Sequence, residues 1–85
     1  MGGTVSLKDV LEVLHEFERL EPGGVSLGLI AWELYQPDAL IAELIELARE
    51  RRLIELAGAD SRSGEALWRL TASGRESAKG SRGPG

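Results

Sequence analysis

The sequence predicts one mainly α-helical domain that ends in a small β-hairpin and a short last helix. Apolar residues recur at helical spacing in three consecutive segments, and two short runs with alternating apolar residues follow them. The loop between these runs, Gly58–Gly64 (G-A-D-S-R-S-G), consists of turn-forming residues. A chain of 85 residues suffices for one domain with a modest core. We therefore expect a three-helix bundle with a two- or three-stranded hairpin sheet.

The first helix is expected to begin at Ser6 and to end before Pro22, whose ring and following glycines stop a helix. Ser6 and Asp9 have the spacing of a capping box, and Val5 and Val10 have that of a hydrophobic staple. The residues expected to face the core are Leu7, Val10, Leu11, Leu14, Phe17 and Leu20.

The second helix is expected over Leu27–Leu34, with Ser26 as its N-cap and Val25 as a strand residue beside the hairpin. Tyr35–Gln36 forms the turn to the next helix, at a place where many such turns hold a glycine. Trp32 allows two interpretations: it lies with Leu29 in an exposed apolar patch, or it folds back over the first helix.

The third helix is expected to take Pro37 as its first residue and to close with the basic run around Arg51, which suits a helix C-terminus. Its inner face carries Leu40, Ile41, Leu44, Ile45, Leu47 and Ala48. Its outer face carries Ala39, Ala42, Glu43, Glu46 and Glu50.

The hairpin is expected to pair Leu53–Ala57 with Glu65–Leu70. Alternation places Trp68 on the face of Leu70, so it packs the hairpin on the bundle or, alternatively, stacks on a base. Thr71 can cap a last helix that runs to about Lys79. The expected organisation is a flexible N-terminus at residues 1–5, a domain at 6–79 and a disordered tail at 80–85.

Charge is distributed unevenly along the chain, whose net charge is −4. Residues 1–57 hold five basic and eleven acidic side chains, whereas residues 58–85 hold five basic and three acidic ones. A nucleic acid would therefore meet the C-terminal third.

Several classes of chemistry are not supported by the residues present. The chain has no cysteine and one histidine, His15, so it cannot form a disulfide or a histidine metal cluster. His15 has no nucleophile near it, and the glycines after Pro22 are not followed by the lysine of a phosphate loop. No membrane-length apolar run or signal-peptide pattern is present. We expect a cytoplasmic protein that is not an enzyme and has no cofactor, metal or membrane partner.

The order of elements resembles the winged helix-turn-helix plan, in which the hairpin is called the wing. Two motifs sharpen the resemblance: R-R-L-I-E-L at Arg51–Leu56 and L-W-R-L-T-A-S-G-R at Leu67–Arg75. The latter motif is similar to the end of the wing in bacterial MarR and PadR type regulators. The resemblance covers about Ser6–Lys79 and implies transcriptional regulation through DNA binding, usually by a homodimer.

The resemblance also implies where DNA would be touched. The wing contacts would be Ser61, Arg62 and Ser63. Phosphate contacts would come from Arg49 and Arg52, which otherwise form a plain helix-end charge cluster. The base-reading positions would be Ala39, Ala42, Glu43 and Glu46, where hydrogen-bond donors are more usual.

A further resemblance is to the FeoC-like group of small winged-helix proteins linked to ferrous iron transport. It rests on V-S-L at Val25–Leu27 and on the short length of the chain. The cysteines often found in the wing of that group are absent, so iron or cluster binding is not implied.

Two functions follow. The leading one is a small DNA-binding transcriptional regulator, and the alternative is a protein-interaction module without DNA binding. The alternative depends on the acidic third helix, and its partner-binding residues would be Leu29, Trp32, Glu43 and Glu46.

Overall fold

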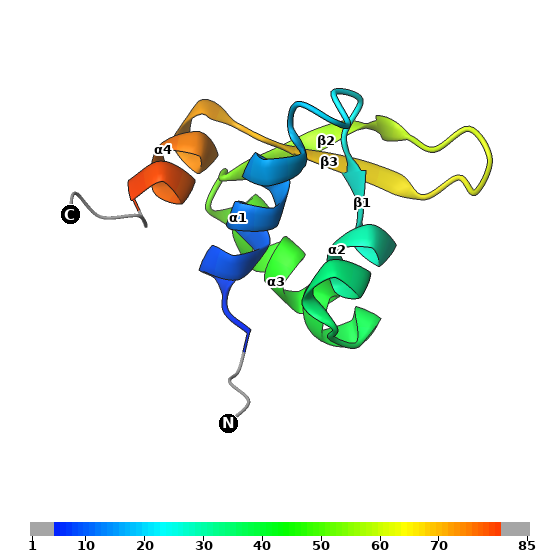
Figure 1. The fold of residues 1–85 in the computed structure, drawn as a ribbon, viewed down its shortest axis with the longest axis horizontal. Helices are drawn as coiled ribbons and strands as arrows, with labels where there is room; N and C mark the ends of the chain where they lie inside the picture. The colour runs from blue at the N-terminus through cyan, green and yellow to red at the C-terminus, as the bar shows by residue number, and fades with distance from the viewer. Residues whose placement is uncertain (1–4, 81–85) are drawn as a thin grey trace.

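Three helices and a three-stranded antiparallel sheet make up the body of the chain, with a fourth helix after the sheet (Figure 1). The structure is a computed structural model and describes residues 5–80. The helices are α1 (Leu7–Phe17), α2 (Leu27–Leu34), α3 (Asp38–Glu50) and α4 (Ala72–Gly80). The strands are β1 (Val25–Ser26), β2 (Ile54–Ala59) and β3 (Ala66–Leu70). This is the predicted winged helix-turn-helix architecture.

The hairpin of β2 and β3 extends away from the helices at one end of the molecule, and α4 lies at the other end (Figure 1). β3 is the central strand, because the order in the sheet is β1-β3-β2. Val25 pairs with Trp68 on one side of β3, and Ile54 pairs with Leu70 on the other. The predicted strand at Val25 is therefore confirmed, and it joins the helix-turn-helix segment to the wing.

The core lies where α1, α2 and α3 meet the inner face of the sheet. Its fully buried side chains include Val10, Leu14, Ile30 and Ile41. The remaining buried apolar residues are Leu11, Val13, Val25, Ala31, Ile45, Ala48, Ile54, Leu70 and Ala78. Trp68 is half-buried and packs against this core, as alternation along its strand predicts.

The prediction that Leu20 faces the core was wrong, because 71% of its surface is exposed. Helix α1 ends at Phe17, well before Pro22, and the chain turns at once toward β1. The Glu21 N–H still donates to the Phe17 carbonyl oxygen at 2.7 Å, which holds this turn. The start of α1 agrees with the expected cap, since the Ser6 N–H donates to Asp9 Oδ2 at 2.9 Å.

The turn between α2 and α3 is made without glycine. Ser26 caps α2 as predicted, accepting the Leu29 N–H on its Oγ at 3.2 Å. Tyr35 ends the helix in the left-handed conformation with φ 55° and ψ 46°, which a residue with a Cβ adopts at a cost. Pro37 is the N-cap of α3 rather than its first helical residue, so that boundary differs by one position from the expectation.

Strand β2 extends farther toward the hairpin tip than predicted, whereas β3 begins at Ala66 rather than at the expected Glu65. β2 begins at Ile54 rather than Leu53 and runs through Gly58 to Ala59, both of which were expected in the loop. Ala57 has no partner on β3, because Leu56 pairs with Trp68 and Gly58 with Leu67. This extra residue is a β-bulge, which lets a strand continue through a local bend.

Helix α4 begins after Thr71, whose Oγ1 accepts the Gly74 N–H at 3.0 Å, as the predicted cap requires. Gly74 has no room for a side chain, since a Cβ there would collide with the carbonyl oxygen of Leu53. The expected loose N-terminus and tail lie outside the described residues except at their inner ends. Val5 packs against the core, and Gly80 is the last residue of α4.

Candidate nucleic-acid interface

The outer face of α3 is small and acidic. Ala39, Glu43, Glu46 and Glu50 are exposed and Ala42 is half-buried, as the helical pattern predicts. Arg49 lies beside them, but its Nη1 is 3.4 Å from Glu46 Oε2 in an exposed ion pair. An exposed pair of this kind adds little stability, yet it neutralises the one positive charge on this stretch of the helix.

The tip of the wing is ordered by Asp60. Its Oδ1 accepts the backbone N–H of Arg62 at 2.7 Å and of Ser63 at 3.2 Å. The Asp60 N–H donates to the Glu65 carbonyl oxygen at 2.8 Å, and Ser63 Oγ accepts the Glu65 N–H at 3.1 Å. Ser61, Arg62 and Ser63 are exposed, so the loop presents one guanidinium on a hydrogen-bonded frame.

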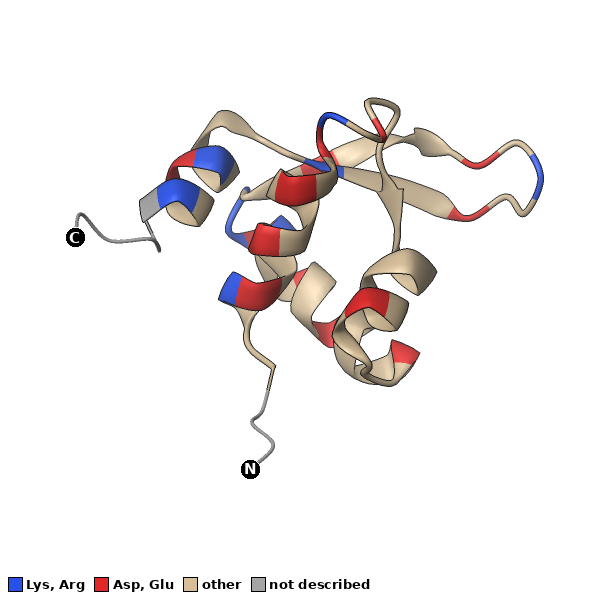
Figure 2. Cartoon of the chain, in the orientation of Figure 1, with Lys and Arg blue, Asp and Glu red and all other residues tan. Residues whose placement is uncertain are grey.

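The cations of the chain differ in their partners. Arg49, Arg69 and Arg75 form ion pairs with Glu46, Glu55 and Glu18. Within residues 5–80, the side chains of Arg62 and of Arg51 and Arg52 form no ion pair. Figure 2 shows a basic segment at the tip of the hairpin, with an acidic segment on either side of it in the loop.

The structure does not bring the two groups of predicted phosphate contacts together. Arg52 follows the end of α3 and Arg62 lies at the wing tip, with β2 between them. A strand of this length spans about 20 Å at 3.3 Å per residue. Arg52 also has φ 60°, and its carbonyl oxygen accepts a hydrogen bond from the hydroxyl of Thr71 at 2.7 Å. Its backbone therefore has a structural role in joining α3 to the base of the wing.

Trp32 is 69% exposed, so the interpretation that it folds back over α1 was wrong. Sequence reasoning missed its neighbour Tyr35, which is 86% exposed. Both line a hollow of about 520 Å³ on the outer side of α2, together with Gly28, Ala31, Gln36 and Asp38. Leu29 is half-buried and packs against the core, so it is not part of this hollow. The sequence held one signal for Tyr35. The turn between α2 and α3 contains no glycine, so a residue with a side chain takes its left-handed position.

Another hollow, which we call the α3–wing groove, lies between α3 and the inner side of the wing. Its volume is about 500 Å³. Its apolar lining comes from Leu27, Ala39, Ala42, Ile45, Ala66 and Trp68. Its acidic lining comes from Asp38, Glu46 and Glu65. Of the two glutamates of α3 predicted to bind a partner, Glu46 borders the groove and Glu43 does not. The groove was not predicted, because only the tertiary fold places Glu65 opposite α3.

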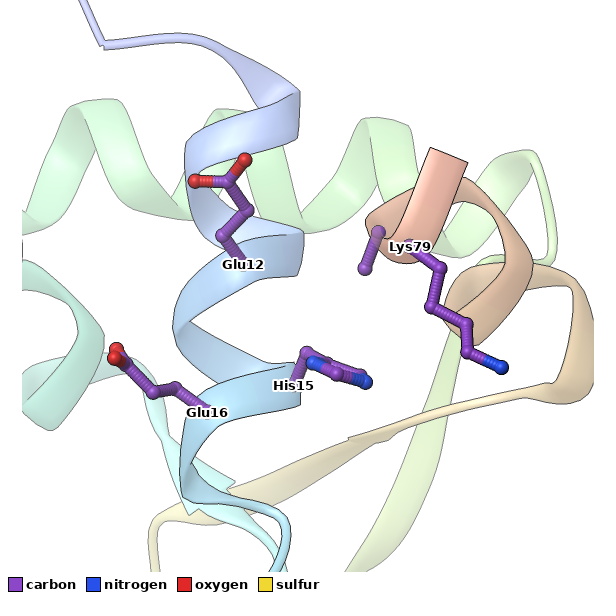
Figure 3. A pocket seen from close by; sticks show the side chains of 5 residues that line it. Glu12, His15, Glu16 and Lys79 are labelled. Carbon is purple, nitrogen blue, oxygen red and sulfur yellow. The ribbon is translucent and has the colours of Figure 1, made fainter. Parts of the chain in front are cut away.

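A third hollow of about 320 Å³ lies between α1 and α4 and is lined by Glu12, His15, Glu16, Ala78 and Lys79. In Figure 3 the His15 ring points toward α4, whereas Glu16 points to the other side of α1. Carboxylates, an imidazole and an amine line this hollow without a hydroxyl or thiol nucleophile among them. Its residues therefore do not form a nucleophile–base pair, and the expectation that the chain is not an enzyme stays a prediction.

Neither a metal cluster nor a membrane span occurs in the part of the chain that the structure describes. Residues 5–80 hold no group of three or more His, Cys, Asp or Glu side chains that is arranged to bind a metal ion. None of the helices in this range is both long and apolar enough to cross a membrane.

Comparisons with known proteins identify the fold. No protein-family model matches the sequence, and no curated protein matches it. Among solved structures, a variant of S. aureus MepR is similar with a TM-score of 0.75 and 20% sequence identity, over 91% of this chain and 54% of that chain. A variant of ZitR from Lactococcus lactis is similar with a TM-score of 0.75 and 21% identity, over 96% of this chain and 57% of that chain.

A third similar structure is AF1382 from Archaeoglobus fulgidus, with a TM-score of 0.73 and 21% identity, over 91% of this chain and 80% of that chain. ZitR is described as a zinc-responsive member of the MarR family. This chain spans little more than half of the MepR and ZitR chains. The predicted MarR-like resemblance is confirmed, and the FeoC-like one stays a prediction. The chain has the winged-helix fold of MarR-type regulators.

Proposed function

We propose that this chain binds duplex DNA as a winged-helix regulator of transcription, with the wing as its principal contact. The observation that carries the proposal is the exposed guanidinium of Arg62 at the tip of the projecting hairpin. Asp60 holds the loop through hydrogen bonds, so the Arg62 side chain extends from a fixed backbone. Since Arg62 has no ion pair within the described residues, it is available to a phosphate without breaking one.

The proposed role of α3 is limited by its chemistry. Ala39 and Ala42 allow the helix to approach a groove closely and offer methyl groups to thymine. Glu43 and Glu46 can each accept a hydrogen bond from the amino group of cytosine, but their charges oppose the phosphates. We therefore expect weak binding by a single chain, and a second chain would add a second wing.

A fluorescence-anisotropy titration into a generic DNA duplex at low and at moderate salt tests this proposal. The expected result is binding at low salt that weakens as salt rises, because phosphate contacts release counterions. Each contact contributes about −0.9 to the slope of the logarithm of the binding constant against the logarithm of the salt concentration. No binding at high micromolar protein and low salt would overturn the proposal for this chain.

A second candidate function is docking of a protein, and here the exposed side chains of Trp32 and Tyr35 are the observation that favours it. Large exposed aromatic residues that line a hollow are typical of protein interfaces. The partner that can be tested directly is a second copy of the chain, which would make the expected homodimer.

Sedimentation velocity at rising protein concentration tests self-association. The native chain is expected to shift toward a dimer, and Trp32→Ala is expected to stay monomeric. The change should alter stability by no more than about 0.5 kcal/mol, as is usual for exposed positions. A native chain that stays monomeric at every concentration would contradict self-docking, and a large loss of stability in Trp32→Ala would show a role in folding instead.

A further inference from the structure

The α3–wing groove combines an apolar floor with an acidic rim. Ile45 at its base is 2% exposed, and Trp68 on the wing side is half-buried. The alanines Ala39, Ala42 and Ala66 leave the groove open, because their side chains end at the methyl group. A hollow of about 500 Å³ has room for a few side chains of a ligand.

The rim charges come from three places in the fold. Asp38 is the first residue of α3, Glu46 lies two turns farther along the same helix, and Glu65 precedes β3. None of the residues that line the groove is a lysine or an arginine. Arg49 contacts Glu46 at 3.4 Å, which leaves Asp38 and Glu65 without an ion pair within residues 5–80.

Glu65 lies at the rim beside the start of α2. A Cβ built on Gly28 would lie 3.7 Å from Glu65 Oε2, so the carboxylate sits directly over the first turn of that helix. The N-terminus of a helix carries a partial positive charge that favours a carboxylate nearby. In this position Glu65 remains exposed to solvent, so its carboxylate is accessible to a ligand.

We propose that the α3–wing groove binds a cationic peptide segment of a partner protein, which places an apolar side chain on the groove floor and its arginine or lysine side chains on the acidic rim. Charge complementarity selects this occupant. Three carboxylates around one opening attract a cationic chain, and they repel the phosphates of a nucleic acid. The apolar floor then favours a peptide with Leu- or Phe-like side chains over a purely polar polycation.

This inference goes beyond the proposed DNA binding and does not depend on it. The groove lies on α3 and the inner side of the wing, whereas the proposed DNA contact is Arg62 at the wing tip. A peptide in the groove would cover Ala39 and Ala42, which the DNA proposal also uses. The two ligands are therefore expected to compete.

The test is an anisotropy titration of the full chain with a fluorescein-labelled peptide of alternating arginine and leucine. The variant Glu46→Gln/Glu65→Gln is expected to weaken binding about fivefold to tenfold, because two exposed charge pairs between the rim and the peptide are lost. The matched control is Glu43→Gln/Glu50→Gln, which removes the same charge from α3 outside the groove and is expected to change binding less than twofold. Equal weakening in both variants would mean that net charge alone binds the peptide, and this would overturn the site.

Two further measurements locate the bound peptide and distinguish the contribution of its apolar side chains from that of its charge. In a ¹⁵N-resolved NMR titration, the largest shifts are expected at the amides of Ala39, Ala42 and Ala66 and at the indole of Trp68. Shifts confined to α1 and α4 would overturn the proposal. An arginine–glycine peptide of equal charge is expected to bind several-fold more weakly, and equal affinity for both peptides would overturn the apolar contact.

The outcome is independent of the DNA experiment. Arg62→Ala is expected to leave peptide affinity unchanged while weakening DNA binding. A chain that binds DNA and not the peptide would overturn this inference alone, and a chain that binds the peptide and not DNA would overturn only the proposed function.

Discussion

Thr71 links the base of the wing to the end of α3 through the backbone of Arg52. Its hydroxyl donates to the Arg52 carbonyl oxygen at 2.7 Å and accepts the Gly74 N–H at 3.0 Å. Its own N–H donates to the Leu53 carbonyl oxygen at 3.0 Å. Thr71 therefore connects the end of β3 to the segment between α3 and β2, and it also caps α4.

Replacing Thr71 by valine keeps the shape of the side chain and removes both hydroxyl bonds. We expect Thr71→Val to lower the free energy of unfolding by about 1–2 kcal/mol, because a helix cap and a tertiary hydrogen bond are lost. Urea denaturation measures the change. Ser73→Ala, at an exposed position of the same helix, should change stability little, and an equal loss in both variants would refute this role of Thr71.

Gly74 tests how tightly α4 lies against the start of the wing. Alanine usually stabilises a helix by about 1 kcal/mol over glycine. Here the added Cβ would strike the Leu53 carbonyl oxygen, which is itself held by Thr71. We expect Gly74→Ala to destabilise by about 1–3 kcal/mol, measured by thermal unfolding. A raised melting temperature would show that α4 can move away, and Ser77→Ala serves as the open-surface control.

Tyr35 is predicted to cost stability through its backbone conformation. Its φ of 55° is unfavourable for a residue with a Cβ, and its ring is mostly exposed. We expect Tyr35→Gly to raise the free energy of unfolding by up to about 1 kcal/mol. Tyr35→Ala keeps the strained Cβ and should give no gain. A destabilised glycine variant would mean that the ring contributes contacts that outweigh the strain.

Arg62 carries the prediction for DNA. Arg62→Ala should weaken binding to all duplex sequences alike and reduce the salt slope by about one unit, because one phosphate contact is lost. Anisotropy titrations over a range of salt concentrations measure both effects. Lys8→Ala removes the same charge from α1 and should leave the slope unchanged. Identical slopes for Arg62→Ala and the native chain would exclude the wing tip as a contact.

The parts of the fold that depend on neighbouring residues were predictable from the sequence. Ser26 and Thr71 act as caps at the expected positions, and α2 has the expected bounds, since a cap needs only residues a few positions away. Most of the core residues of α1 and α3 follow from helical spacing for the same reason, although the spacing missed Val13, and Leu40 and Leu47 are only half-buried. The prediction that Leu20 faces the core was wrong because the helical pattern in the sequence continues past the point where the chain turns toward β1.

The candidate site was less predictable, since it depends on which elements meet. Helical spacing places Trp32 on an outer face but cannot say whether another element covers it. The α3–wing groove needs the hairpin register and the packing of the hairpin against the helices, neither of which is a local property. Arg52 and Arg62 were both predicted to contact DNA, yet a whole strand separates them in space.

The bulge at Ala57 has a consequence for aggregation. β2 is an edge strand of the sheet, and Leu56 on it is 60% exposed. A regular outer strand with such a side chain is a template on which further chains add strands. Because the bulge bends β2 next to Leu56, the strand does not offer an unbroken row of hydrogen-bonding groups. The wing can thus protrude from the body while resisting growth into a fibril-like stack.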